Sequence, residues 1–90
     1  MRKDIKTSCQ KRLSRIEGQV RGLSKMVDED RYCADILTQI SSVQEALRGV
    51  GRELMRNHLK HCATGAIRTG GRQADQMYDE IVELMYTHSR

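Results

Sequence analysis

Residues 33–62, CADILTQISSVQEALRGVGRELMRNHLKHC, decide the fold of this chain of 90 residues. Apolar residues recur along this stretch at alternating steps of four and three, the spacing of a coiled-coil-like helix: Ile36, Ile40, Val43, Leu47, Val50 and Leu54. The pattern predicts a helix from about Arg31 to Ala63, roughly 50 Å long. Because the remaining residues are too few to cover such a helix, we expect it to pack against a second copy of itself.

Two shorter helical patterns flank this helix. The first, at about 4–27, carries apolar residues at steps of three or four: Ile5, Cys9, Leu13, Ile16, Val20, Leu23 and Val27. The last runs over about 73–88, and a connection is expected before it at 64–71. The chain contains no proline, phenylalanine or tryptophan, so we expect an all-α fold with a core of Leu, Ile, Val and Met. The predicted protomer is one domain, residues 1–90, of three helices.

The charge distribution indicates a polyanionic partner. The net charge is +4, and basic residues are concentrated in residues 1–26. This concentration favours nucleic acid as a partner, although a solvated helix face has the same composition. No apolar run approaches the roughly 20 residues of a membrane span, and we expect no secretory signal. The prediction is a cytoplasmic protein with no membrane partner, in which three cysteines bind metal or react rather than form disulfides.

Cys33, His58 and Cys62 form the sharpest chemical pattern in the chain. Cys33 lies three residues before Ile36, and His58 lies four residues after Leu54, so both extend the apolar stripe of the long helix. His58 and Cys62 are four residues apart and can chelate one ion from a single helix. Cys33 and His58 face the same way but lie about 37 Å apart along a continuous helix, so one chain cannot bring all three together.

Antiparallel pairing of two copies removes this separation. With the two-fold axis near 46–47, Cys33 of one chain meets His58 and Cys62 of the other, and two identical sites result. Two thiolates and an imidazole make a soft, three-coordinate site that suits Cu(I), whereas Zn(II) usually takes a fourth ligand. A plainer interpretation stays open, because a cysteine on an apolar stripe is commonly a small buried hydrophobe. His61 is a weaker candidate, since it points about 100° from Cys62.

The sequence around these residues resembles the copper-sensitive operon repressor (CsoR) family. The resemblance rests on residues 32–62 and on RLSRIEGQVRGL at residues 12–23, and it covers residues 6 to about 86. It implies a small all-helical bacterial repressor that assembles as a dimer of dimers. It also implies that affinity for operator DNA falls when Cu(I) binds.

The resemblance also assigns residues to the site. The metal ligands of the copper-sensing branch fall on Cys33, His58 and Cys62. A tyrosine and a glutamate that surround those ligands in the family fall on Tyr32 and Glu80. The function that follows is a Cu(I)-responsive transcriptional repressor whose site lies between subunits.

Other branches of the family supply the alternatives. Nickel and cobalt sensors add an N-terminal histidine, and formaldehyde sensors use an N-terminal proline; no histidine precedes His58 here, and the chain has no proline. Persulfide sensors keep both cysteines but lack the histidine. A thiol-sensing repressor, in which Cys33 bridges to Cys62 of the partner subunit, is therefore an alternative, as is a Ni(II) sensor. Cys9 fits none of these patterns and is expected in the core.

The DNA-binding residues also rest on the resemblance. Arginines that contact DNA in the family fall on Arg12 and Arg52. Basic neighbours complete the expected set: Lys11, Arg12, Arg15, Arg48, Arg52 and Arg56. The last three are four residues apart and share one face of the long helix, where Glu45 and Glu53 can balance part of their charge. The chain has no helix-turn-helix pattern, so we expect phosphate contacts that weaken strongly with salt.

No catalytic residues are expected. A three-coordinate Cu(I) site leaves no obvious open position for a substrate. A copper store or chaperone is an alternative from another class, and a failure to retard DNA at low salt would favour it.

Overall fold

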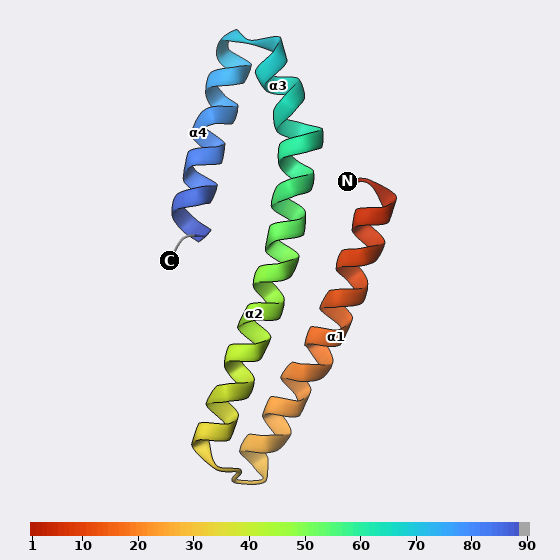
Figure 1. Ribbon diagram of the computed structural model, residues 1–90, viewed down its shortest axis with the longest axis vertical. Coiled ribbons are helices and arrows are strands. Elements are labelled where there is room, and N and C mark those ends of the chain that lie inside the picture. The colour runs from red at the N-terminus through yellow and green to blue at the C-terminus, as the bar shows by residue number, and fades with distance from the viewer. Residues whose placement is uncertain (89–90) are drawn as a thin grey trace. The chain divides into compact units, whose positions relative to one another are not determined.

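The computed structural model describes residues 1–88, and its regular elements are all helices (Figure 1). They are α1 (Lys3–Asp28), α2 (Cys33–His58), the π-helical turn η1 (Leu59–Ala63), α3 (Thr64–Thr69) and α4 (Gly71–His88). The predicted all-α class and long second helix are confirmed. None of the helices described combines the length and the hydropathy needed to cross a membrane. The chain divides into two compact units, Met1–Met55 and a second that begins at Arg56.

The helical backbone that follows α2 continues further than the sequence predicts. A connection at 64–71 is wrong, because residues 64–69 form α3. Two threonine hydroxyls bond back to the helix: Thr64 Oγ1 donates to the Leu59 carbonyl and Thr69 Oγ1 to the Gly65 carbonyl, each at 2.9 Å. The two hydroxyls thus form hydrogen bonds within the helix rather than with backbone groups of a loop.

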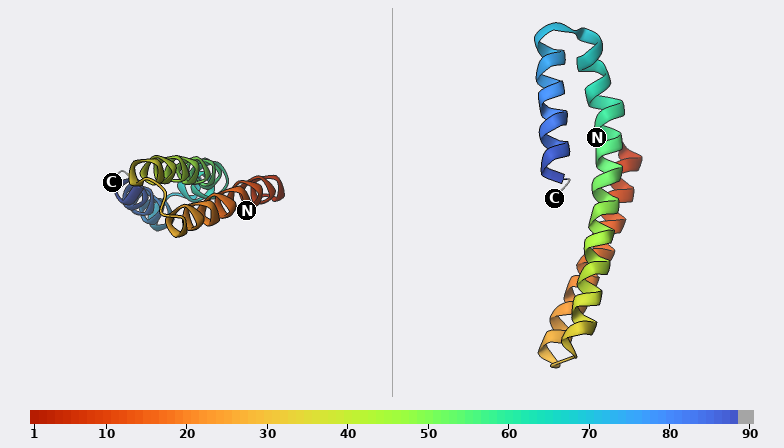
Figure 2. Two further views of the ribbon diagram at one scale, coloured as in Figure 1. Left: turned by 90° about the horizontal axis from the view of Figure 1, so that it is seen from below. Right: turned by 60° about the vertical axis from the view of Figure 1, so that its left-hand side comes forward.

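The chain reverses at two glycines. Gly70 has φ 78° and ψ −168°, a combination that is essentially restricted to glycine. Gly71 follows at φ 56° and is the first residue of α4. The helix thus begins two residues earlier than expected. Figures 1 and 2 show α4 running back alongside α3 after this turn.

In the first unit, α1 and α2 pair in an antiparallel hairpin around a narrow core (Figure 1). The buried residues are Cys9, Ile16, Val43 and Val50, and Ile5, Leu23, Ala46 and Leu54 pack around them. The buried pair on each helix is seven residues apart, which is the repeat of coiled-coil packing. The core therefore forms from one side of each apolar stripe.

The other side of each stripe is exposed. On α1 and α2, large apolar residues are exposed at Leu13, Val20, Val27, Leu37, Ile40 and Leu47. The sequence predicts that Val43, Val50 and Leu54 pack on a second copy of the long helix, whereas they pack on α1 of the same chain. A single neighbouring helix covers only part of a broad apolar stripe, so the residues beside this contact stay exposed.

The second unit is built on small side chains. Ala63 and Ala74 are its buried apolar residues among those described, and small residues let helices approach closely. On α4, apolar residues at steps of three or four are partly buried: Met77, Ile81 and Leu84. Their neighbours Tyr78 and Met85 are exposed. The side chain of His88 lies outside the described residues.

The turn between α1 and α2 is a Schellman motif. The Arg31 N–H donates to the Met26 carbonyl at 2.9 Å, and the Asp30 N–H donates to the Val27 carbonyl at 3.1 Å. This motif needs a left-handed residue after the helix cap, a position that glycine usually fills. Here Asp30 fills it, at φ 53°.

Replacing Asp30 by glycine is therefore expected to stabilise the protein by about 1 kcal/mol, because an L-residue is strained in the left-handed region. Urea unfolding at a fixed protein concentration measures the change. The matched control is Asp28→Gly, which makes the same substitution in right-handed helical backbone and should lower stability by roughly 0.3 kcal/mol. Equal effects of the two substitutions would contradict the strain argument.

Candidate metal centre and nucleic-acid interface

The three expected ligands lie at the ends of helical segments. Cys33 is the first residue of α2 and His58 is its last, while Cys62 lies in η1. Both cysteines are free and exposed. Among residues 1–88, no group of three His, Cys, Asp or Glu side chains comes close enough to hold a metal ion. Within one chain, the three expected ligands therefore do not form a metal site.

A carboxylate from α4 lies beside His58. Its Nε2 atom is buried and lies 3.0 Å from Oε1 of Glu80. The direction of this contact falls outside hydrogen-bond geometry. A carboxylate beside one imidazole nitrogen orients the ring and leaves the other nitrogen free for a metal. The structure therefore brings together His58 and Glu80, two residues expected in and around the site.

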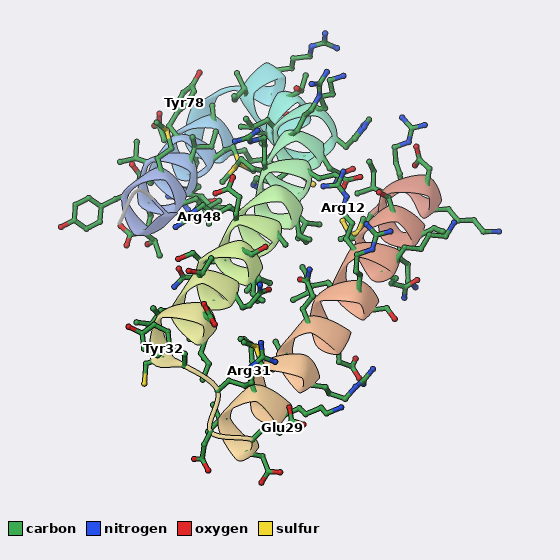
Figure 3. All side chains as sticks on the ribbon, turned by 60° about the horizontal axis from the view of Figure 1, so that its bottom comes forward. Arg12, Glu29, Arg31, Tyr32, Arg48 and Tyr78 are labelled. Atoms are coloured by element: carbon green, nitrogen blue, oxygen red, sulfur yellow. The ribbon has the colours of Figure 1, made fainter. Side chains whose placement is uncertain are left out.

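Tyr32 directly precedes the first residue of α2 (Figure 3). Its carbonyl accepts the backbone N–H groups of Asp35 at 3.0 Å and Ile36 at 3.3 Å, so its backbone begins the helix. Its side chain is 74% exposed. The structure places Tyr32 next to Cys33 in the chain and shows its ring directed to solvent.

A π-helical turn carries Cys62. Residues 59–63 form η1 directly after His58, and the Thr64 hydroxyl bonds to the first carbonyl of this turn. Four residues advance slightly more than one turn of an α-helix, whereas the i→i+5 bonds of a π-turn widen it so that they advance less. The turn therefore shifts Cys62 around the helix axis relative to the position that regular helical spacing predicts.

Arg12 reaches from α1 onto the surface of α2 (Figure 3). Its Nε atom lies 3.5 Å from Oε2 of Glu53. Its Nη1 atom lies 3.5 Å from the point that a Cβ on Gly49 would occupy. The guanidinium therefore lies over one turn of α2, between a glycine and a glutamate four residues later.

The other basic residues of the expected DNA-binding set are exposed. Arg48 pairs with Glu45 at 3.0 Å on the surface of α2. Within the described part of the chain, four of the set have no ion pair: Lys11, Arg15, Arg52 and Arg56. Of the two acids expected to balance the arginines of α2, Glu45 pairs with Arg48, whereas Glu53 pairs with Arg12 of α1.

Cys9 is a core residue, as predicted. It is 5% exposed and belongs to the buried cluster between α1 and α2. Burial raises the pKa of its thiol, the negative charge of Glu53 raises it further, and Arg12 acts in the opposite direction. A thiol in this setting is a poor nucleophile, because little of it is ionised.

Comparison with known proteins decides the family. A family model described as metal-sensitive transcriptional repressor matches residues 5–87. The chain belongs to this family. Its members are transcriptional repressors rather than enzymes, in agreement with the expectation of no catalytic residues.

Individual relatives of this chain are described more narrowly, as copper-sensing transcriptional repressors. It is 54% identical over 70 residues to the copper-sensing transcriptional repressor RicR of Mycobacterium tuberculosis, over 78% of this chain and 73% of RicR. It is 53% identical over 73 residues to the copper-sensing transcriptional repressor CsoR of Bacillus subtilis, over 81% of this chain and 70% of that one. A crystal structure of the copper-sensing repressor CsoR with Cu(I) from Geobacillus thermodenitrificans matches it with a TM-score of 0.90 and 44% identity, covering 100% of this chain and 92% of the other.

Three features of the repressor's structure were not predicted from its sequence. The π-turn at residues 59–63 has no clear signal in the sequence. Asn57 is buried, and its Oδ1 atom has no hydrogen bond within the described residues; a buried asparagine looks like a surface residue in a helical pattern. The contact between Arg12 and Glu53 could have been suspected from the sequence. Gly49 has no side chain and therefore leaves room on α2 one turn before that glutamate.

Proposed function

We propose that this repressor binds operator DNA in its metal-free state and releases it when Cu(I) binds. Membership of a metal-sensitive repressor family supports the switch. Relatives described as copper-sensing, at 53–54% identity, support copper as the metal. The observation that carries the proposal is the donor set: two exposed thiols and an oriented imidazole, which together prefer Cu(I).

The proposed ligands are Cys33 of one chain with His58 and Cys62 of the partner subunit. Cys33 and His58 begin and end α2, and 25 residues of helix separate them by about 37 Å, which favours a site shared by two chains. Nε2 of His58 faces Glu80, so Nδ1 is the nitrogen available to a metal. Glu80 orients the imidazole, and Tyr32 lies beside Cys33 as the second residue proposed around the site.

The proposed assembly is an antiparallel dimer that pairs into a dimer of dimers and acts in the cytoplasm. The exposed apolar residues of α1 and α2 described above supply surfaces for such contacts. In this arrangement residues 1–90 work as one DNA-binding and metal-sensing domain. Each dimer carries two identical metal sites.

The proposed DNA-binding surface consists of Lys11, Arg12, Arg15, Arg48, Arg52 and Arg56. Their exposure supports this role, since phosphate contacts need side chains that reach solvent. Repetition of the surface in an oligomer multiplies the number of phosphates neutralised, so affinity should fall steeply as salt rises.

Fluorescence anisotropy tests the proposed function. A labelled duplex from the DNA upstream of the protein's own coding sequence is bound by the metal-free protein and titrated anaerobically with Cu(I). We expect release at about one Cu(I) per chain, as the shared site requires. Retention of the DNA at saturating Cu(I) would overturn the copper switch, and absence of binding at low salt would overturn repression itself.

Thiol sensing is a second candidate, favoured by the exposure of both Cys33 and Cys62. His58→Ala separates the two functions. If copper is the signal, we expect Cu(I) affinity to fall by about 100-fold or more, because even outer partners of a metal ligand are worth 10- to 100-fold. Competition with a chromophoric Cu(I) chelator measures this fall. DNA release by a persulfide donor in wild type and variant alike, with an unchanged Cu(I) affinity, would instead support thiol sensing.

A further inference from the structure

The ion pair between Arg12 and Glu53 joins the two helices of the first unit. Arg12 comes from α1 and is 53% exposed, whereas Glu53 comes from α2 and is 21% exposed. The contact uses Nε of the guanidinium, and neither terminal nitrogen forms a hydrogen bond within residues 1–88. An arginine held through Nε can still present its Nη atoms to a phosphate.

Glu53 depends on this contact. Its Oε2 atom, the one that faces Arg12, is buried and accepts no hydrogen bond within residues 1–88. A buried carboxylate oxygen without a hydrogen bond is costly unless a positive charge lies beside it. Moving Arg12 away would leave this buried oxygen without a positive charge beside it, which favours the paired arrangement.

Gly49 supplies the space for this arrangement. A Cβ at this position would lie 3.5 Å from Arg12 Nη1, an ordinary contact, but a longer side chain would occupy the volume of the guanidinium. On the surface of α2, Gly49 thus leaves space for the guanidinium of Arg12, and Glu53, one helical turn later, supplies a negative charge beside it.

We propose that Glu53 is a positioning residue for DNA binding, which holds Arg12 against α2 with its terminal nitrogens presented to the DNA backbone. This inference rests on the proposed function, in which Arg12 contacts operator DNA. It assigns an acidic residue a favourable role in binding a polyanion. Charge alone predicts the reverse, because removing a negative charge from a DNA-binding surface strengthens non-specific binding.

The two effects predict opposite changes in DNA affinity when Glu53 loses its charge, and this difference can be tested. Glu53→Gln and Glu45→Gln each remove one negative charge from α2, but Glu45 pairs with Arg48 on the exposed surface and forms no ion pair with α1 within the described residues. We expect Glu53→Gln to weaken binding to the upstream duplex by about 5- to 10-fold. Glu45→Gln should bind as tightly as wild type or more tightly. Anisotropy at several salt concentrations, with a scrambled duplex of equal length, measures both affinity and selectivity.

Two further variants show whether Glu53 acts through Arg12. In an Arg12→Ala background, Glu53→Gln should have no additional weakening effect, since the pair is already lost. Gly49→Leu keeps Glu53 but fills the space of the guanidinium, so it should weaken operator binding while circular dichroism shows the same helix content. Thermal unfolding of each variant reports whether the fold is retained.

Binding by Glu53→Gln that matches Glu45→Gln would overturn the positioning role while leaving the proposed function intact. Equal weakening by Glu53→Gln with and without Arg12 would also overturn it, since the effect would then be structural. A wild-type protein that does not prefer the upstream duplex over the scrambled one fails the proposed function itself, and the positioning role falls with it.

Discussion

Cys33→Ala is expected to bind operator DNA as tightly as the wild-type protein and to lose its response to Cu(I). Cys33 lies at the start of α2 with an exposed side chain, away from the basic residues proposed to contact DNA. Its removal leaves one thiolate and one imidazole at the site. Partners that only support a metal ligand are worth 10- to 100-fold in affinity, so loss of a direct ligand should cost more than about 100-fold.

The anisotropy titration measures this effect directly. The control is Cys9→Ala, which removes a thiol buried between α1 and α2 and should preserve release by Cu(I). If Cys33→Ala still releases DNA at one Cu(I) per chain, the ligand assignment is wrong. If it fails to bind DNA in the absence of copper, Cys33 has a role in the fold that its exposure does not indicate.

Ile16→Ala should have the largest effect on stability, lowering the free energy of unfolding by about 3 kcal/mol. Ile16 is 6% exposed and is one of the buried residues of a narrow core that contains no phenylalanine or tryptophan. The loss combines the transfer free energy of the deleted atoms with the cavity that they leave. It is a large part of the 5–15 kcal/mol that typically stabilises a domain.

Urea unfolding followed by circular dichroism checks this value. The protein concentration must be equal in all samples, because stability depends on concentration if chains associate. Ile16→Val is the matched control and should cost only about 1 kcal/mol. A loss below 1 kcal/mol for Ile16→Ala would show that Ile16 contributes little to the core.

The fold could be predicted from the sequence because each helix buries one face, and burial leaves a periodic pattern. Ile16 and Val50, both buried, stand at heptad spacing with Cys9 and Val43. Periodicity identifies a face but not the neighbour that covers it. For that reason Val43 and Val50 were expected against a second copy, although they pack on α1.

The helix end beyond Ala63 could not be predicted from residue types. Threonine and glycine have low helix propensity, which favours a connection there. The chain nevertheless stays helical there, and the hydroxyls of Thr64 and Thr69 donate to carbonyls of the preceding turn. The reversal instead occurs at Gly70, where the backbone needs a positive φ.

The candidate site was predicted in part. Spacing singled out Cys33, His58 and Cys62, and the resemblance added Glu80, which does lie beside His58. The sequence could not show the π-turn around Cys62. An α-turn and a π-turn differ only in which backbone carbonyl accepts each N–H, and no residue type marks that difference. The roles of these residues as metal ligands stay predictions until the titrations above are made.

The burial of Cys9 gives the protein a chemical reporter of its own opening motions. Alkylating reagents reach Cys33 and Cys62 directly, since both are exposed, whereas Cys9 reacts only when α1 and α2 separate, and even then only after its thiol ionises. The rate of this third alkylation therefore reports how often the helical hairpin opens. Measured with and without DNA, that rate would show whether binding an operator slows the opening of the core beneath Arg12.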